Sequence, residues 1–254
     1  MPRRKKNQLP ELTESNYYSI EANKEFWSAS MYKAMMKCEA AAMARIRGQY
    51  EPPLTRALLV GSFVDSYIEG SLERFKEEHP EVFTLKEELR AEFRRANAVI
   101  KRIESSNKFM AYLSGEKQKI LVFEMFGVPW KIKMDSFIEG KCIVDLKTAA
   151  KMEWLPRQRY ELQGAVYQAG TDACGYGKLP FYLAVATKEK IPDLGIFQIP
   201  QSMLDMALQE IGENMPHLIE VKSGLIAPKR CEKCPYCRAT REIKVRDYRE
   251  LLEV

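Results

Sequence analysis

The sequence predicts a mixed α/β fold, in which a sheet is flanked by helices and preceded by a helical part. Three observations lead to this prediction. The 254 residues are 46% hydrophobic and 30% charged, which suits a globular protein with enough apolar residues for a core. Apolar residues recur at helical spacing before about residue 115 and alternate with polar residues after it. A further helical pattern then separates these strands from a later one, as in folds whose helices cover a mixed sheet.

Three helices are predicted in the amino-terminal part. In the first, Met31, Met35 and Cys38 lie on neighbouring rows of a helix, and two prolines at 52 and 53 break the chain after it. The second ends near Gly70, since glycine is common just after a helix. The third is strongly charged, which is typical of a helix with a solvated face. The three ranges are 29–48, 55–68 and 85–103.

The strands are predicted in the middle of the chain and in its last third. Gly127 separates the first two, and Glu139-Gly140-Lys141 is a turn before the third. Pro216 is expected to interrupt the last helix, because proline lacks a backbone N–H. The predicted strands are 120–126, 128–134, 142–146, 181–187 and 195–199, with helices over 161–169 and 202–221.

The net charge of +5 comes from 40 basic and 35 acidic residues. Such an excess is compatible with nucleic-acid binding, but many enzymes are equally basic. Residues 1–11 form a basic tail, which we expect to be disordered and solvated; the alternative is an arm that contacts phosphates. No segment resembles a secretory signal or a membrane span, so we expect a cytoplasmic protein.

Two carboxylates and a lysine fall on the polar face of neighbouring predicted strands. The apolar residues of 130–134 alternate, so that Asp135 falls on the opposite face. In the next strand, Val144 and Leu146 point one way, and Asp145 and Lys147 point the other way. If these strands pair as neighbours, Asp135 and Asp145 can converge on one cation, with Lys147 beside them.

Hard oxygen ligands of this kind suit Mg²⁺ or Mn²⁺, which also bind substrate phosphate. The ion polarises a phosphodiester and lowers the pKa of a bound water. A neighbouring lysine can orient that water or offset charge that develops on phosphate. An acid two residues before a lysine is common by itself, so the significance of the pattern depends on its strand context and on the helix after it.

Gln163 and Tyr167 lie four residues apart on one face of that next helix. In this order, the chain resembles the RecB-like nucleases of the PD-(D/E)XK superfamily. The resemblance implies a restriction-endonuclease-like core in which Asp135 and Asp145 bind metal and Lys147 is catalytic. Gln163 and Tyr167 would line the DNA side of the site. These families usually place a metal-binding histidine on an earlier helix, four residues after a glycine; here the corresponding residue is Asp65.

Six cysteines are present, and three of them lie within seven residues. Cys231, Cys234 and Cys237 can aim at one ion, and Cys38 is the candidate for a fourth ligand. Cys142 and Cys174 are expected to pack as small apolar residues. Four thiolates can hold Zn²⁺ or a [4Fe–4S] cluster. The close spacing favours the cluster, and one early and three late cysteines resemble the layout of AddB-type nucleases, although the last spacing is shorter here. Either group would join the two ends of the chain as a staple.

The stretches 28–33, 59–63, 144–148 and 185–189 resemble phage exonucleases of the RecE-like group. The resemblance implies one nuclease domain over 12–254, with a helical part at about 12–115, a catalytic core at about 116–222 and a cysteine tail at about 223–254. It implies a Mg²⁺-dependent exonuclease that resects linear double-stranded DNA to single-stranded tails for phage-type recombination. A RecT-like single-strand annealing protein would be its partner, and a homo-oligomeric ring its assembly.

Two other functions stay open on the sequence. One is a nuclease acting on single-stranded or branched DNA, as in CRISPR adaptation. The other is a non-catalytic, metal-stapled module that binds DNA or protein.

Overall fold

The structure is a computed structural model of the whole chain, and it describes residues 11–243, 245 and 247–251. The predicted basic tail lies outside the described residues except for Glu11. The strands are β1 (Lys119–Met125), β2 (Val128–Met134), β3 (Ser136–Ile138), β4 (Cys142–Ala149), β5 (Phe181–Thr187) and β6 (Leu194–Gln198). The α-helices are α1 (Ile20–Glu25), α2 (Ala29–Lys37), α3 (Glu39–Ile46), α4 (Arg56–Glu69), α5 (Leu72–Glu78), α6 (Ala91–Glu104), α7 (Asn107–Tyr112), α8 (Tyr160–Ala173), α9 (Gln201–Ser223) and α10 (Pro235–Ala239), and the 3₁₀-helices are η1 (Pro80–Val82), η2 (Met152–Gln158) and η3 (Tyr248–Leu251).

A four-stranded mixed sheet in the order β3-β4-β5-β6 forms the centre of the fold. The β4 and β5 strands are parallel, and α8 lies in the crossover between them; the outer pairs are antiparallel. The β1 and β2 strands form a separate antiparallel hairpin. The structure therefore confirms the predicted mixed α/β class with helices flanking the sheet.

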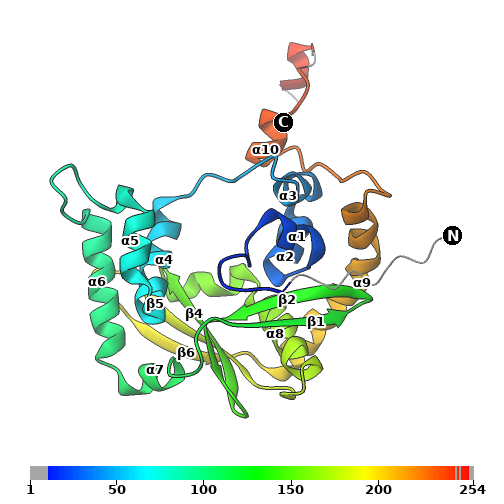
Figure 1. Cartoon of the computed structure of the whole chain (residues 1–254). Coiled ribbons are helices and arrows are strands. Elements are labelled where there is room, and N and C mark those ends of the chain that lie inside the picture. Colours follow the sequence, from blue (N-terminus) through cyan, green and yellow to red (C-terminus); the bar gives the residue numbers. More distant parts are fainter. Residues whose placement is uncertain (1–10, 244, 246, 252–254) are drawn as a thin grey trace.

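Each face of the sheet has its own apolar core. Ile143, Leu183 and Val185 pack with residues of α2, α3, α8, α9 and the hairpin. Their sequence neighbours Val144 and Ala184 point to the other face and pack with α4, α6 and α7. This alternation is the two-residue period of a strand that is buried on both sides. Figure 1 shows the resulting division, with α4 to α7 on one side of the molecule and α1 to α3 and α9 on the other.

The predicted helix over 29–48 is two helices, because the chain is extended at Cys38, with φ −167° and ψ 105°. This residue ends α2 and begins α3. Apolar spacing continues through the break, so the sequence pattern did not reveal it. The break turns Cys38 toward the carboxyl-terminal cysteines, so a long-range contact overrides the local helical preference.

Two other helix predictions were wrong in part. The charged helix begins at Ala91 rather than near 85, because residues 83–90 form a turn in which Phe83 pairs with Leu89. Pro216 does not interrupt α9, which runs unbroken from Gln201 to Ser223. Buried residues on both sides of Pro216 keep α9 in the core, and such packing stabilises a helix more than local propensity does.

The two strands that were expected to pair as neighbours do not pair. The short strand β3, which the sequence pattern did not predict, lies between β2 and β4 along the chain and pairs with β4. Three residues are too few for an alternation signal. The turn at 139–141 and the five predicted strands are otherwise present, with ends shifted by up to three residues. Among the described residues, no helix is long and apolar enough to cross a membrane.

Candidate active site

Asp135 and Asp145 meet through the register of β3 and β4. Ser136 pairs with Val144, so Asp135 lies opposite Asp145 one step further along. Asp135 Oδ2 accepts a hydrogen bond from the backbone N–H of Leu146 at 2.9 Å, which fixes its carboxylate against β4. The convergence predicted from alternation is therefore present, although β3 rather than β2 produces it.

Lys147 lies beside this pair. Its Nζ is 2.5 Å from Asp145 Oδ2, and the Asp145 side chain is 1% exposed. Burial, with a smaller contribution from Asp135, raises the pKa of the Asp145 carboxyl to about 7 against the opposing effect of Lys147. Burial lowers the pKa of Lys147, but the Asp145 and Asp135 carboxylates outweigh burial and raise it. Lys147 is thus held as a cation. It lies next to the Asp145 carboxylate, whose charged form is disfavoured by burial.

Gln163 and Tyr167 reach the site from α8. Gln163 Nε2 donates a hydrogen bond to Asp145 Oδ1 at 2.6 Å. Tyr167 Oη donates to the Lys133 carbonyl at 2.8 Å, and burial raises the pKa of the Tyr167 hydroxyl well above its usual value. The four-residue spacing places both side chains on the face of α8 that packs on the sheet. Gln163 holds the carboxylate of Asp145, whereas Tyr167 holds the backbone of β2.

Asp65 and Glu69 approach from α4, which Thr55 caps and Gly70 ends in a left-handed conformation. Asp65 Oδ1 is inaccessible to solvent and has no hydrogen-bond partner in the described part of the chain. Burial and the nearby Asp135 raise the pKa of the Asp65 carboxyl. A small cavity of about 10 Å³ lies between Asp65, Glu69 and Asp135, with apolar residues on its other side. That volume is about one water sphere.

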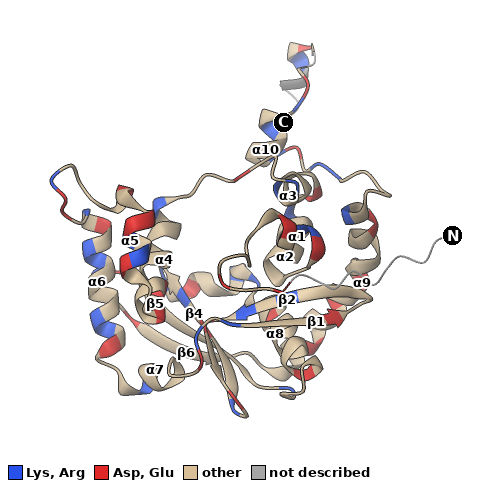
Figure 2. Cartoon of the chain, viewed as in Figure 1, with Lys and Arg blue, Asp and Glu red and all other residues tan. Residues whose placement is uncertain are grey.

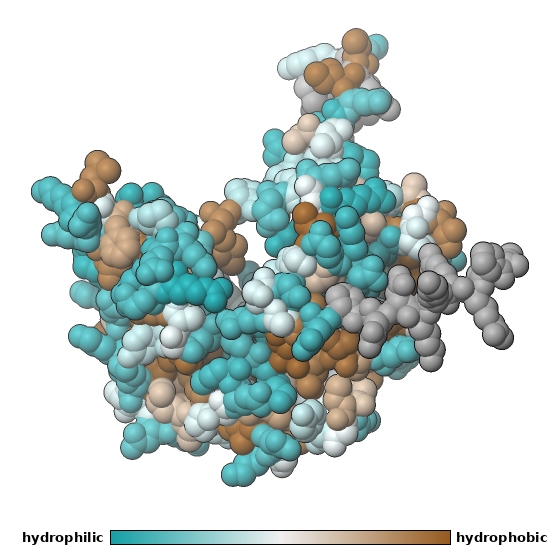
Figure 3. Space-filling view, in the orientation of Figure 1, coloured by the Kyte–Doolittle hydropathy of each residue, from teal (hydrophilic) through white to brown (hydrophobic). Residues whose placement is uncertain are grey.

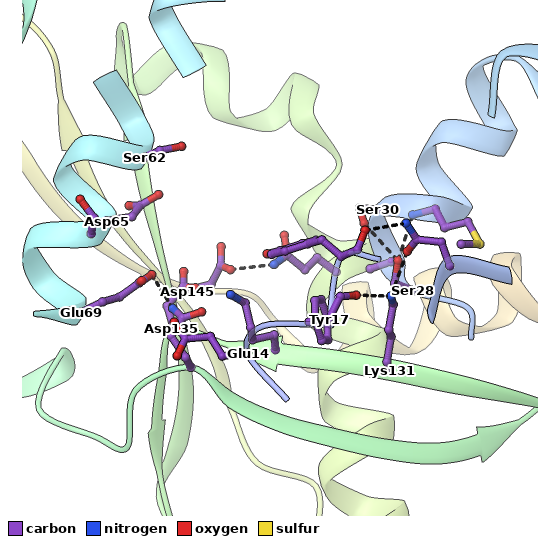
Figure 4. A pocket seen from close by; sticks show the side chains of 18 of the residues that line it. Glu14, Tyr17, Ser28, Ser30, Ser62, Asp65, Glu69, Lys131, Asp135 and Asp145 are labelled. Atoms are coloured by element: carbon purple, nitrogen blue, oxygen red, sulfur yellow. Dashed lines mark hydrogen bonds between the residues drawn. The ribbon is translucent and has the colours of Figure 1, made fainter. Parts of the chain in front are cut away.

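A cleft of about 940 Å³ contains all six predicted residues, Asp65, Asp135, Asp145, Lys147, Gln163 and Tyr167. Figure 4 shows Asp65 and Glu69 on α4 facing Asp135 and Asp145. The opposite wall is formed by α2 and α3, and the surface is hollowed between these two parts of the molecule, with mainly hydrophilic residues along the hollow (Figure 3). Figure 2 shows basic residues on α3 and β2, at the borders of this region.

The carboxylates fit a divalent cation. Three of them surround a cavity of the size of one water, and the Asp65 oxygen without a hydrogen-bond partner is a free ligand atom. Buried carboxylates with raised pKa values are costly without a cation, and oxygen donors suit Mg²⁺ or Mn²⁺. Among the described residues, only the cysteines bring three or more candidate ligand atoms within 4.8 Å of one another. The carboxylates come from α4 and from the sheet, on the same side of the cleft, and are spread more widely than the cysteine sulfurs.

Replacing Asp65 with asparagine is expected to stabilise the metal-free protein by a few degrees at pH 8. Because folding raises the pKa of Asp65, wild-type stability falls as the pH rises above the ordinary value of 3.8, and Asp65→Asn lacks this loss. The two proteins should therefore melt together at pH 3.5. Thermal unfolding in EDTA at both pH values measures this, and added Mg²⁺ should stabilise the wild type more than the variant. A variant that is less stable at pH 8 in EDTA would contradict the buried, unfavourable carboxylate.

The four cysteines predicted as a metal site come together away from the cleft. All four Sγ atoms of Cys38, Cys231, Cys234 and Cys237 lie within 4.8 Å of one another, and the Cys38 and Cys237 sulfurs are 3.5 Å apart. Backbone amides lower the pKa of Cys231 to about 6, which favours the thiolate that binds metals. Cys142 and Cys174 lie elsewhere, as expected.

Contacts around the cysteines fasten α3 to the carboxyl-terminal segment. Glu39 accepts hydrogen bonds from His217 Nε2 at 2.9 Å and from the Lys229 backbone N–H at 2.8 Å. The Tyr236 ring packs against Tyr50, with 5.2 Å between centroids. Tyr50 belongs to the connection from α3 to α4, so the cysteine region also contacts the segment that spans the two walls of the cleft.

Glu69 and the cationic wall of the cleft were not predicted from the sequence. Burial raises the pKa of Glu69 to about 7, and its carboxylate accepts a hydrogen bond from Gln118 at 2.5 Å. The sequence could have indicated Glu69, because it lies four residues after Asp65 and therefore on the same face of α4. Lys33 and Lys37 line the cleft from α2. Lys33 lies in the stretch 28–33 that resembles RecE-like exonucleases, but that resemblance assigned it no role.

Comparisons with known proteins agree with this fold. The crystal structure of a "Putative exonuclease" from Eubacterium rectale is similar over 96% of this chain and 98% of that chain, with 43% identity and a TM-score of 0.92. The structure of SSO0001 is 14% identical over 85% of this chain and 96% of that chain, with a TM-score of 0.33. A comparison with curated proteins finds no match.

A family model described as a PDDEXK-like domain of unknown function, DUF3799, matches residues 28–240. The matched range begins at the amino-terminal cap of α2 and ends just after α10, so it includes the whole sheet, the six predicted residues of the cleft and all four clustered cysteines. The match covers most of the chain, and this protein belongs to the DUF3799 family of PDDEXK-like domains.

Proposed function

We propose that this protein is a metal-dependent DNA nuclease whose reaction centre is Asp135, Asp145 and Lys147. The observation that carries the proposal is their convergence, with Gln163, in one cleft: Lys147 Nζ is 2.5 Å from Asp145 Oδ2, and Gln163 holds the other Asp145 oxygen at 2.6 Å. Family membership and the name of the Eubacterium rectale relative support a nuclease. A non-catalytic module is disfavoured, because it would have no need of a buried, charged lysine–carboxylate pair.

Each residue has a part in phosphodiester hydrolysis. Asp135 and Asp145, with Asp65 nearby, would hold Mg²⁺ or Mn²⁺, which would polarise the phosphate and make a bound water more acidic. Lys147, kept protonated by Asp145, offsets the negative charge that develops on the phosphate. Gln163 fixes the orientation of Asp145, so that its second oxygen faces Lys147. Asp65 and Glu69 bring further negative charge to the same side of the cleft.

The substrate we propose is the end of linear double-stranded DNA, resected to a single-stranded tail for recombination by annealing. The support is the resemblance to RecE-like exonucleases and the name of the relative with 43% identity. The same resemblance is the ground for proposing a RecT-like annealing partner and a ring-shaped homo-oligomer. The phage origin of the chain has the same support.

One observation favours a second candidate, a nuclease that cuts single-stranded or branched DNA. The cleft of about 940 Å³ is in the size range of small-molecule sites, which suits a short stretch of one strand better than a duplex. A duplex end would have to open before its strand reached Asp145. An enzyme specific for single strands needs no such step.

A cleavage assay with and without Mg²⁺ separates these functions. Its substrates are linear duplex, single-stranded and covalently closed circular DNA. We expect Mg²⁺-dependent loss of the linear duplex, with the closed circle intact because it offers no end. The length of the products on a denaturing gel shows whether one strand is resected. Degradation of single strands alone would favour the second candidate. No cleavage of any substrate with Mg²⁺ or Mn²⁺ would overturn the assignment as a nuclease.

For the cysteine site we propose a structural metal, and the sulfur spacing fits Zn²⁺. Four tetrahedral Zn–S bonds of about 2.3 Å place sulfurs about 3.8 Å apart. The observed separations, 3.5 Å for Cys38 to Cys237 and within 4.8 Å for all pairs, are close to this. In a [4Fe–4S] cluster each thiolate binds a different iron, so the sulfurs would have to move apart. The cysteine order, which resembles AddB-type nucleases, keeps the cluster as the alternative.

A further inference from the structure

The wall of the cleft that faces the carboxylates is cationic. Lys33 and Lys37 lie four residues apart on α2, and both line the cleft that contains Asp145. The buried residues of α2, Met31, Tyr32 and Met35, face the core and leave these lysines on the cleft side. Within the described part of the chain, neither lysine has a carboxylate within 4 Å, whereas Arg45 on α3 pairs with Glu51 at 3.2 Å.

Lys33 is the member of this wall that reaches the reaction centre. Its Nζ lies 5.2 Å from the centroid of the Tyr160 ring at the start of α8, and Lys147 Nζ lies 5.9 Å from the same centroid. Lys33 Nζ also donates a hydrogen bond to the Gln158 carbonyl at 2.6 Å, which positions the ammonium and leaves two donors free. The ammonium groups of Lys33 on α2 and Lys147 on β4 therefore both lie near the Tyr160 ring.

Such an arrangement is unfavourable without a further anion. Burial, Lys37 and Lys147 lower the pKa of Lys33, in that order of size, and the nearby Asp145 and Glu161 carboxylates raise it without reversing the shift. Like charges that are brought together at fixed positions repel each other, and an anion between them removes the repulsion. The cleft is the proposed site of a phosphodiester, and backbone phosphates are the anions that DNA offers next to the bond that is cut.

We propose that Lys33 binds a phosphate of the DNA strand next to the scissile phosphodiester, with the Tyr160 ring and the Gln158 carbonyl holding its ammonium in place. This inference rests on the proposed nuclease function and names a second point of substrate contact. Lys33 and Lys147 would then bracket the cleaved strand, with Lys147 at the reacting phosphate and Lys33 at a neighbouring one. The phosphate can be internal or the terminal one of the strand.

The test compares Lys33→Gln with wild type. Glutamine keeps a donor for the Gln158 carbonyl and removes only the charge, so a purely structural lysine would tolerate it. Binding of a fluorescent single-stranded oligonucleotide is measured without divalent ions at several salt concentrations. We expect about tenfold weaker binding for Lys33→Gln and a salt slope smaller by about 0.7, the value for one phosphate contact on a single strand. Lys24→Ala, an exposed lysine of α1 outside the cleft, should bind as wild type does.

Steady-state cleavage with Mg²⁺ adds a second readout. Lys33→Gln should raise KM by about the same factor as it weakens binding. Lys33→Arg keeps the charge and should therefore have a KM close to that of the wild type. Oligonucleotides with a terminal phosphate or a terminal hydroxyl show which phosphate Lys33 binds. If Lys33→Gln weakens binding only of the phosphorylated oligonucleotide, Lys33 binds the terminal phosphate. If it weakens binding of both equally, Lys33 binds an internal phosphate. Unchanged binding and an unchanged salt slope in Lys33→Gln would overturn the inference, even if the wild type cleaves DNA. A wild type that binds DNA through Lys33 but never cleaves it would overturn only the proposed function.

Discussion

Lys147→Ala is expected to lower DNA cleavage by at least about 10²–10³-fold, the loss found when one preorganised group that stabilises a transition state is removed. Lys147 is held as a cation by Asp145 at 2.5 Å, so its charge is in place before the phosphate arrives. Alanine removes that charge and also leaves the Asp145 carboxylate, 1% exposed, without its ion-pair partner. Initial rates with Mg²⁺ and a linear duplex measure the effect.

Binding and a matched lysine serve as controls for this prediction. Lys151 follows β4 on the same segment, is exposed and lies outside the cleft, so Lys151→Ala should cleave at the wild-type rate. Lys147→Ala should still bind DNA, since the other cationic residues of the cleft remain. If Lys147→Ala is folded by circular dichroism and cleaves as fast as wild type, the reaction centre is not at Asp145 and Lys147.

The grouping of Asp145 with Lys147 was predictable because it depends on strand alternation, which is a local property. Asp145 and Lys147 lie on one face of β4 in any fold that contains this strand. Gln163 could be assigned only through a resemblance, because helical spacing alone does not say which strand a helix packs on. Glu69 and Lys33 were missed for a related reason. Each is an ordinary charged residue of a helix surface until the tertiary fold places it in a cleft.

The errors in the predicted fold also come from contacts that are distant in the sequence. Cys38 interrupts a helical pattern to reach cysteines that lie almost two hundred residues away, and no local rule contains that contact. Pro216 has the opposite effect: it predicts a break that the packing of α9 overrides. The β3 strand is defined by its pairing with β4 and not by its own three residues. Long-range contacts decided all three cases.

Cys234→Ser is expected to abolish binding of the structural metal and to lower the melting temperature by about 10–20 °C. The proposed metal would join Cys38 to Cys231, and chain entropy for a crosslink over a loop of roughly 190 residues gives about 5 kcal/mol as an upper value. Serine is nearly isosteric but does not replace a thiolate as a soft ligand. Metal content by mass spectrometry and thermal unfolding measure the two effects. Zinc in the wild type would agree with the sulfur spacing, and iron with absorption near 400 nm would favour the cluster.

Cys174→Ser is the matched control, because Cys174 lies at the end of α8, where its Sγ lies 3.6 Å from the Val122 carbonyl, outside the cluster. It should keep both the metal and the melting temperature. The contact between the cysteine site and the connection from α3 to α4 also predicts an effect of metal loss on DNA binding. Tyr236 contacts Tyr50 in the connection between the two walls, so loss of the metal should loosen that connection and raise the KM for DNA more than it lowers kcat. A Cys234→Ser protein with wild-type stability and no metal would show that contacts such as those of Glu39 hold the two ends of the chain together without it.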